Sequence, residues 1–234
     1  ENNALLFMDK YLEYRDVIAK VDSLAAGFTD LNLKKGDVVT LAMPNVFEAI
    51  FVFYALNKIG IVCHMVHPLT PAIQMSKFMK ETQSKVLVIM DTFYDHFHQL
   101  LDEGDKSFVL VNPVEEFGFL KKIGYRLINA KKLKRIKYNA NVMKLSELYK
   151  DFQVEEPKIN PKDTAFLLHS GGTSGEPKTI ELSNYAINYL AGQLPYIMGL
   201  KDFQDVHMLA VLPMFHGFGL CMGIHGMLMS GGVD

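Results

Sequence analysis

Residues 36–66 read GDVVTLAMPNVFEAIFVFYALNKIGIVCHMV, and this stretch decides the fold. The apolar run over residues 38–43 predicts a buried strand. Asn45 follows it, in position to cap a helix whose apolar residues continue until Gly60. A second apolar run, over residues 61–66, predicts the next strand. A strand, a helix and a strand in this order predict two parallel strands joined by a crossover helix.

The same alternation continues on both sides of this stretch. Upstream, apolar residues at helical spacing predict a helix over residues 17–31. Downstream, the pattern predicts a helix ending near Thr82, strands over residues 85–90 and 106–111, and a helix over residues 92–103. Short buried strands that alternate with amphipathic helices indicate an α/β fold with a mostly parallel sheet flanked by helices.

Composition excludes several classes of protein. The chain has 234 residues, of which 49% are apolar and 21% charged, so it can bury a core and is not disordered. Its 17 glycines and 9 prolines are too few for a collagen-like chain. A net charge of −2 provides no overall field for nucleic acid, so no nucleic-acid partner is expected.

Cysteine usage and the absence of a leader favour a soluble, cytoplasmic protein. Cys63 and Cys221 lie far apart in apolar runs, which fits neither a disulfide framework nor a metal site. No basic leader with an apolar signal core opens the sequence. The longest apolar stretch, residues 206–233, is broken by Pro, His and Gly residues and is a poor candidate for a membrane span.

A basic interval spans residues 117–146, which contain no acidic residue. One interpretation is a solvated helical hairpin with basic outer faces. Another is peripheral contact with anionic lipid headgroups through the 121–144 stretch. Its basic residues are Lys121, Lys122, Arg126, Lys131, Lys132, Lys134, Arg135, Lys137 and Lys144.

The polar segment DFQVEEPKINP, residues 151–161, is typical of a linker because it contains two prolines and few apolar residues. We therefore predict an N-terminal α/β subdomain over residues 1–155, with a basic helical insertion near residues 117–146. Residues 156–234 are then the start of a second α/β subdomain, expected to be incomplete, that carries the chemistry.

A glycine-rich segment follows the strand predicted over residues 164–169. Residues Ser170–Lys178 read SGGTSGEPK, and the pattern turns helical from Glu181. Glycines let backbone N–H groups approach a phosphate, hydroxyl groups can bind phosphate or Mg²⁺, and lysine adds a positive charge. The P-loop pattern does not fit, because Pro177 precedes the lysine. A flexible surface loop is the alternative that this segment alone leaves open.

A second motif, LPMFHGFG, occupies residues 212–219. A strand predicted over residues 207–212 leads into a proline turn that presents Phe215 and His216. A Gly- and Met-rich apolar helix is expected to follow, and such residues can form a roomy apolar cavity. Taken alone, His216 fits a structural histidine better than a functional one.

Together these motifs resemble the adenylate-forming superfamily, which includes acyl-CoA synthetases, luciferases and the adenylation domains of peptide synthetases. SGGTSGEPK is similar to the phosphate-binding signature of that family and LPMFHGFG to its next motif. Residues 33–71 are similar to its N-terminal subdomain, and the resemblance extends from about Asp9 to Asp234. It implies two half-reactions. A carboxylic acid and MgATP give an acyl-adenylate and pyrophosphate, and a thiol, usually coenzyme A, then takes the acyl group.

The resemblance also implies roles for individual residues. Lys178 is the catalytic residue that neutralises the leaving pyrophosphate. Phe215 and His216 flank the substrate carboxylate, and Gly219 lines the acyl tunnel. Ser170 lies nearest to Mg²⁺. The residues that surround the β- and γ-phosphates are Ser170, Gly171, Gly172, Thr173, Ser174 and Gly175.

The choice of acid follows from His216. Amino-acid-activating relatives usually have an aspartate there, and a neutral imidazole cannot balance a substrate ammonium group, so α-amino acids are disfavoured. The apolar segment after Gly219 and the basic interval favour a medium- or long-chain fatty acid, while aryl acids and the oligomeric state stay open.

Two departures from the family pattern qualify the expected activity. Thr179 occupies a position that is usually glycine. The sequence also lacks the family's later motifs, namely the aromatic-Gly-x-Thr-Glu motif, the ribose-binding aspartate, the hinge and the C-terminal lysine. We therefore expect an N-terminal part of an acyl-CoA synthetase that is inactive by itself. The alternative is a non-catalytic nucleotide- or acyl-binding protein that retains the fold.

Overall fold

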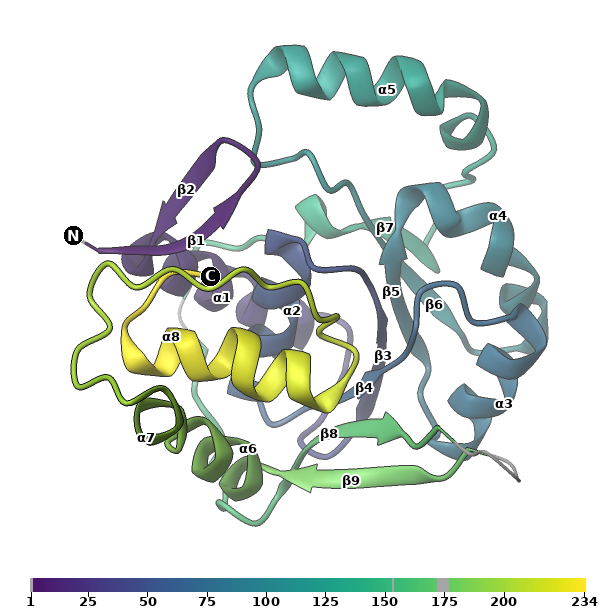
Figure 1. The fold of residues 1–234 in the computed structure, drawn as a ribbon. Coiled ribbons are helices and arrows are strands. Elements are labelled where there is room, and N and C mark those ends of the chain that lie inside the picture. The colour runs from purple at the N-terminus through teal and green to yellow at the C-terminus, as the bar shows by residue number, and fades with distance from the viewer. Residues whose placement is uncertain (1, 153, 172–176) are drawn as a thin grey trace.

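A computed structural model describes residues 2–152, 154–171 and 177–234. A seven-stranded sheet runs through the molecule in the order β7-β6-β5-β3-β4-β8-β9, and only its β8–β9 pair is antiparallel (Figure 1). This confirms the predicted mostly parallel α/β fold. The strands are β3 (Val38–Ala42), β4 (Val62–Met65), β5 (Val86–Met90), β6 (Ser107–Val111), β7 (Val142–Lys144), β8 (Thr164–His169) and β9 (Thr179–Ser183).

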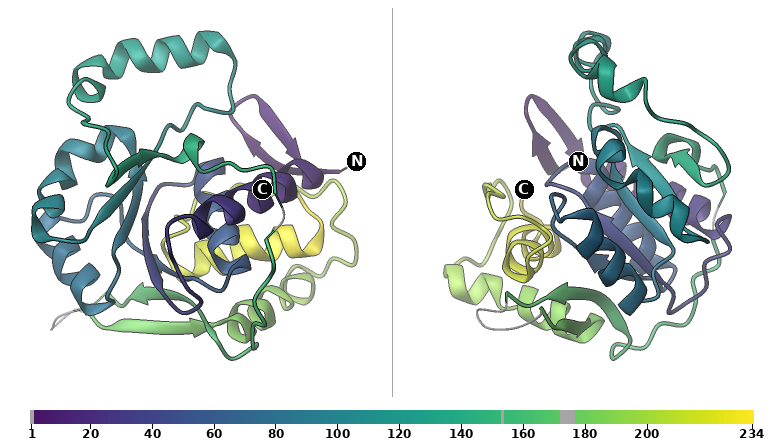
Figure 2. Two further views of the ribbon diagram at one scale, coloured as in Figure 1. Left: turned by 180° about the vertical axis from the view of Figure 1, so that it is seen from behind. Right: turned by 90° about the vertical axis from the view of Figure 1, so that its right-hand side faces the viewer.

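Helices cover both faces of the sheet, as Figure 2 shows from the side. They are α1 (Tyr14–Thr29), α2 (Phe47–Lys58), α3 (Ala72–Glu81), α4 (Tyr94–Phe97), α5 (Phe119–Leu133), α6 (Asn184–Ala191), α7 (Leu194–Met198) and α8 (Met227–Ser230). Short 3₁₀ turns occupy Asp91–Phe93, His98–Glu103 and Leu145–Glu147, and a π-helix over Gly219–Gly226 leads into α8.

The molecule has two hydrophobic cores, one on each face of the sheet, because each strand of a parallel sheet is buried on both faces. In β5, Val86 and Val88 pack into the core that holds α1 and α2. Leu87 and Ile89 point the other way and pack with α3 and α4. This period of two explains why the strands are continuous apolar runs in the sequence.

A hairpin of β1 (Asn3–Phe7) and β2 (Lys10–Glu13) precedes α1 and has no counterpart among the predicted elements. It pairs with the last residue of the chain, since Leu6 N donates to Asp234 O at 2.6 Å and Asp234 N donates to Ala4 O at 3.0 Å. Residues 2–6 and 234 therefore lie side by side.

Several local predictions were wrong. The chain turns helical at Asn184 rather than Glu181, because residues 179–183 extend the sheet as β9. The helix predicted over residues 92–103 is α4 between two 3₁₀ turns. The predicted helical hairpin is α5 alone, followed by an irregular segment and β7.

The segment before LPMFHGFG also differs from the prediction. Residues 207–212 form no strand and contribute a single bridge, from His207 to Val233. Asn45 does not cap α2, whose N-cap is Val46. Local periodicity cannot foresee either result, because both depend on contacts between residues distant in sequence.

The sheet continues across the predicted boundary at residue 155. In β4 and β8, Cys63 pairs with Phe166 and His64 with Leu167. The division into two subdomains stays a prediction, and these contacts join its two parts in one sheet. Cys63 and Cys221 are both buried free thiols.

Candidate active site

The glycine-rich segment connects β8 to β9, whose antiparallel ladder ends with His169 opposite Thr179. Beyond this pair, Ser170 N donates to Lys178 O at 2.9 Å, and Lys178 N donates to Ser170 Oγ at 3.0 Å. Ser170 and Lys178 thus close the base of the loop, and the ladder fixes their spacing.

Four of the predicted phosphate-binding residues, Gly172, Thr173, Ser174 and Gly175, lie outside the described residues. Of the others, Gly171 and Lys178 are exposed and Ser170 is half-buried. No ion-pair partner of Lys178 occurs among the residues that the structure describes. Its ammonium group is therefore available to an anion at the mouth of the loop.

Asn45 holds the approach to the LPMFHGFG motif in place. Its Nδ2 donates to Ala210 O at 2.9 Å and to Leu212 O at 3.0 Å, while its Oδ1 accepts from Met214 N at 2.8 Å. All hydrogen-bonding groups of one side-chain amide are thus used on an irregular segment. Asn45 is a positioning residue that the sequence reasoning assigned to a helix cap instead.

The motif itself is a tight turn beside the end of β8. The Phe215 ring is buried and lies 4.7 Å from the ring of His67, while His216 is exposed. A Cβ atom on Gly217 would lie 3.1 Å from Leu168 Cδ1, two residues before Ser170. The structure therefore places the two predicted motifs next to each other through β8.

Gly219 has a clear steric reason in this turn. A Cβ atom there would lie 2.3 Å from Pro213 O and 2.7 Å from Leu212 O, which is closer than any side chain can approach. Glycine is thus required for the turn to close, while its predicted role in lining an acyl tunnel stays a prediction.

Two histidines lie at the end of β8 where the glycine-rich segment begins, His64 buried and His169 half-buried. His64 Nε2 and His169 Nε2 are 2.6 Å apart, and the His169 ring stacks on Phe78 at 3.6 Å. Burial lowers the pKa of His64 to about 3 and also lowers the pKa of His169, so both rings are neutral at physiological pH.

The network around His64 determines which ring nitrogens carry hydrogens. Thr40 Oγ1 donates to Ser84 Oγ at 2.8 Å, so its single hydrogen is used. His64 Nδ1, 3.0 Å from the same oxygen, must then donate, and its Nε2 must accept from His169 Nε2. The last residue of β8 is therefore held in one tautomer and one orientation.

The profile of the AMP-binding enzyme family matches residues 1–233. The chain belongs to this family. Among curated relatives, it is 26% identical to a long-chain-fatty-acid–CoA ligase of Bacillus subtilis over 94% of this chain and 40% of the relative. It is also 26% identical to a 4-coumarate–CoA ligase of Vanilla planifolia, over 91% of this chain and 36% of the relative. The chain thus spans about two fifths of the length of these relatives.

Solved structures agree with the family fold. A long-chain-fatty-acid–CoA ligase from Archaeoglobus fulgidus superposes with a TM-score of 0.74 at 22% identity, over all of this chain and 44% of that one. At this level of identity, the likeness establishes the fold, which is that of the AMP-binding enzymes.

Several cavities lie among the described residues of this member of the AMP-binding enzymes. Two of them lie beside the ends of the central strands, and neither is lined by Lys178, Phe215 or His216. One, of about 420 Å³, lies between β1, the start of α2 and residues 207–210. The other, of about 470 Å³, lies beneath α5. No helix among the described residues is both long and apolar enough to cross a membrane.

Proposed function

We propose that this chain provides the phosphate loop and the acyl-facing turn of an AMP-forming acid–thiol ligase. In this proposal a carboxylic acid reacts with MgATP to give an acyl-adenylate and pyrophosphate, and coenzyme A then accepts the acyl group. The observation that carries the proposal is that Gly217 of the turn packs against Leu168 of β8, and that the chain leads from this strand to Ser170, which is hydrogen-bonded to Lys178.

The chemistry explains why both parts are needed. A carboxylate that attacks a phosphate ester is repelled by the negative charge of the phosphates, so cations and N–H dipoles must offset that charge. Lys178 provides the cation, and Ser170 with Gly171 and the rest of the loop provides hydroxyl and N–H groups. Phe215 and His216 would flank the carboxylate.

Ser170 fits a secondary role at Mg²⁺ rather than a complete metal site. The described residues contain no group of three His, Cys, Asp or Glu side chains that could hold a metal ion. Proteins commonly bind Mg²⁺ through few side chains together with the substrate's phosphates, so the Ser170 hydroxyl would add one oxygen ligand to those of ATP.

A medium- or long-chain fatty acid is the substrate that we favour. His216 offers no counter-charge to an amino acid, and the segment after it is apolar, with Leu220 and Ile224 fully buried. The Bacillus subtilis relative carries a long-chain fatty-acid name. The 4-coumarate–CoA ligase among the relatives favours an aryl acid as the second candidate.

The test begins with the reading frame downstream of the Asp234 codon. If it encodes the missing motifs, the complete product should catalyse acid-dependent ATP–pyrophosphate exchange, and the 234-residue chain should not. Lys178→Ala should slow exchange by about 10- to 1000-fold, whereas Lys201→Ala, which removes an exposed lysine outside the loop, should have no effect. Unchanged exchange in Lys178→Ala would refute its role, and a stop codon after Asp234 would favour a binding protein without catalysis.

We also propose that α5 contacts anionic membranes. Its exposed apolar residues include Leu120 at 83%, Leu127 at 72% and Ile128 at 84%, with lysines beside them. Apolar side chains combined with lysines suit the interface of an anionic bilayer.

Cosedimentation with phosphatidylglycerol vesicles tests this contact. Binding should weaken with added salt and be lost in Leu127→Glu, while Leu209→Glu, at a leucine outside α5 that is even more exposed, should retain it. Equal binding of both variants would exclude α5 as the contact.

A further inference from the structure

The cavity of about 470 Å³ beneath α5 lies where ligands bind in open α/β sheets. The chain runs first through β3, then places β4 on one side of it and β5 on the other, so the strand order reverses between β3 and β5. Ligands of such sheets bind at the carboxyl ends of the strands at this reversal. Glu48 follows β3, Asp91 follows β5 and Asn112 follows β6, and all three line the cavity.

Glu48 is the most unusual of these residues. Its side chain is only 2% exposed, and neither carboxylate oxygen accepts a hydrogen bond from another described residue. Burial raises its pKa to about 7, and the nearby acids Glu115 and Glu116 add to the increase. Buried polar groups in proteins nearly always have a partner, so an unpaired carboxylate in a cavity wall indicates a missing donor.

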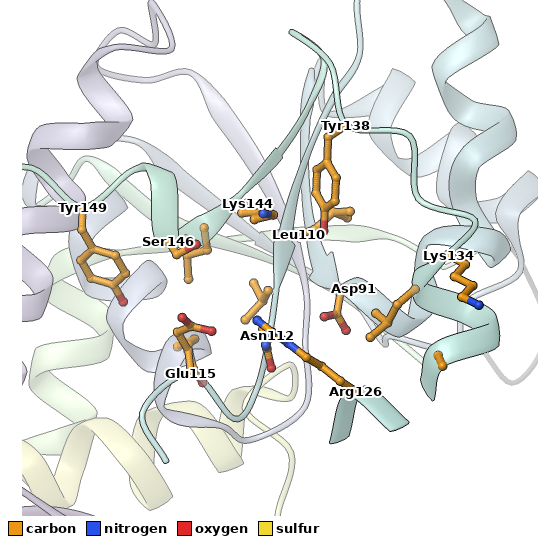
Figure 3. Close-up of a pocket in the computed structure, with 15 residues that line it drawn as sticks. Asp91, Leu110, Asn112, Glu115, Arg126, Lys134, Tyr138, Lys144, Ser146 and Tyr149 are labelled. Atoms are coloured by element: carbon orange, nitrogen blue, oxygen red, sulfur yellow. The ribbon is translucent and has the colours of Figure 1, made fainter. Parts of the chain in front are cut away.

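A second unpaired group lies in the same cavity. The hydroxyl of Tyr149 is buried and has no hydrogen-bond partner in the described part of the chain. Figure 3 shows its ring entering from one side, with Arg126 reaching in from α5 and Glu115 between them. Two independent polar groups therefore lack partners in one cavity.

The cations and acids nearby do not satisfy Glu48. Lys20 is bonded to Glu116 at 2.6 Å, and Lys10 lies 3.8 Å from that carboxylate. Asp91 accepts a hydrogen bond from the Tyr125 hydroxyl. A metal ion is a poor candidate, because no group of three acidic, His or Cys side chains that could hold one occurs among the described residues.

Cations also line the cavity. Arg126 is exposed and forms no ion pair that the described residues reveal, while Lys144 lies 4.9 Å from the centre of the Tyr138 ring. Leu110 and Leu133 add apolar surface to the lining. The cavity thus offers a buried acid, apolar side chains and an exposed guanidinium group.

We propose that this cavity binds a small zwitterion, with its ammonium group against Glu48 and Tyr149, its carbon chain along Leu110 and Leu133, and its anionic group at Arg126. An ammonium group would donate the hydrogen bonds that Glu48 lacks and would balance its charge. The guanidinium plane of Arg126 suits a carboxylate or a phosphate equally. The inference does not depend on the proposed ligase activity.

Three probes of equal length test the two charges separately. They are 6-aminohexanoate with both charged groups, hexylamine with the ammonium group and hexanoate with the carboxylate. Binding to the 234-residue chain is followed by NMR chemical-shift changes, which detect affinities in the millimolar range. We expect 6-aminohexanoate to bind most tightly, hexylamine more weakly and hexanoate not at all.

Variants assign each end of the ligand. Glu48→Gln should weaken 6-aminohexanoate and hexylamine by about tenfold, the factor that a net charge-assisted hydrogen bond of about 1.4 kcal/mol gives. Arg126→Gln should weaken 6-aminohexanoate and leave hexylamine unchanged. Lys131→Gln is the matched control, since Lys131 is an exposed cation of α5 that does not line the cavity, and it should bind like the unmodified chain.

The pH dependence provides a readout that a purely structural role of Glu48 would not change. Because the ammonium group needs an ionised Glu48, affinity should fall as the pH drops below about 7, and in Glu48→Gln this fall should begin only near pH 6, where burial places the pKa of Asp91. Asp91, Glu115 and Tyr149 also face the cavity and stay in place in this variant. Equal binding by Glu48→Gln, binding of hexanoate as tight as that of 6-aminohexanoate, or no binding of any probe would overturn the proposal.

Discussion

Helices α2 and α5 are both rich in apolar residues, but one is buried and the other is exposed. More than half of the residues in each are apolar. In α2, nine of twelve residues are buried, from Phe47 to Leu56. In α5, none of fifteen is buried, and Figure 1 shows this helix standing apart at one edge of the molecule.

The difference lies in where charge is placed. The charged residues of α2 are Glu48 and Lys58, close to its two ends, so its middle is apolar on all sides and packs between α1 and the sheet. Five cations are distributed along α5, and its contacts with the body are polar, through Tyr125 to Asp91 and Lys121 to Asp9. Apolar content alone therefore does not predict burial, because a helix with cations along its length cannot be enclosed by a core, as α2 is, without burying charge.

The largest effect is expected when a large side chain is removed from each helix in turn. Phe51 of α2 is fully buried, so Phe51→Ala should lower the free energy of unfolding by about 3–5 kcal/mol. Leu127→Ala in α5 should change it by no more than about 0.5 kcal/mol, because that side chain is 72% exposed. Urea unfolding of both variants measures this, and equal losses would show that α5 packs against the body.

The next largest effect should be the pH dependence of stability that Glu48 of α2 causes. The pKa of Glu48 rises from 4.5 in the unfolded chain to about 7 in the folded one, so the folded state binds the proton more tightly. Stability from this group is therefore full below pH 4.5 and is lost as the pH rises through about 7, by up to about 3 kcal/mol. In Glu48→Gln, urea unfolding below pH 4.5 and above pH 7 should show no such loss of stability.

Glu103 provides a control, because its contribution to stability changes with pH in the opposite direction. Hydrogen bonds from Ser76 and Lys80 lower its pKa to about 2, so its contribution is present above 4.5 and is lost as the pH falls toward 2. Glu103→Gln should therefore destabilise the protein at neutral pH. If Glu48→Gln behaved in the same way, Glu48 would have a donor after all.

Replacing one glycine in α1 and one in α5 tests how closely other atoms approach the backbone of each helix. A Cβ atom on Gly27 of α1 would lie 1.6 Å from Leu148 O, so Gly27→Ala must displace the backbone and should cost at least about 1–3 kcal/mol. Gly124 of α5 has no atom within 4 Å of that position, and Gly124→Ala should stabilise by about 0.5–1 kcal/mol. Thermal unfolding shows whether each substitution raises or lowers the stability. A destabilised Gly124→Ala would contradict the open surroundings of α5.

The smallest effect concerns the ion pair that ties α5 to the N-terminal hairpin. Lys121 bonds to Asp9, whose side chain is 74% exposed, and this lowers the pKa of Asp9. Lys121→Ala should cost little stability, as the loss of an exposed ion pair does, and less at high salt. Amide exchange in α5 should quicken while that in α2 is unchanged, and a loss of several kcal/mol would mean that α5 belongs to the cooperative core.

Much of the sheet was predictable because its signals are local. The apolar runs that became β3, β4, β5 and β6 are buried on both faces, and a strand of this kind is apolar at every position. The hydroxyl- and glycine-rich run at residues 170–178 was recognisable for the same reason, since a phosphate-binding loop needs those residues in one segment. Its predicted roles stay proposals.

Predictions failed where distant residues decide the local structure. Residues 179–183 form β9 because β8 is available to pair with them, although their own pattern indicates a helix. Asn45 binds residues 210–214 instead of capping α2, across more than 160 positions in the sequence. Hydrogen-bond partners so far away leave no trace in local periodicity.

The sequence by itself determined the α/β class, the positions of the central strands along the chain and the family resemblance, because side-chain period and loop composition are encoded within a few neighbouring residues. Only the tertiary structure decided that α5 stands away from the core, that His169 is paired with His64, and that Glu48 faces a cavity without a partner. Each of these depends on which elements the strand order brings together, and burial and unpaired charge follow from that arrangement rather than from any single segment.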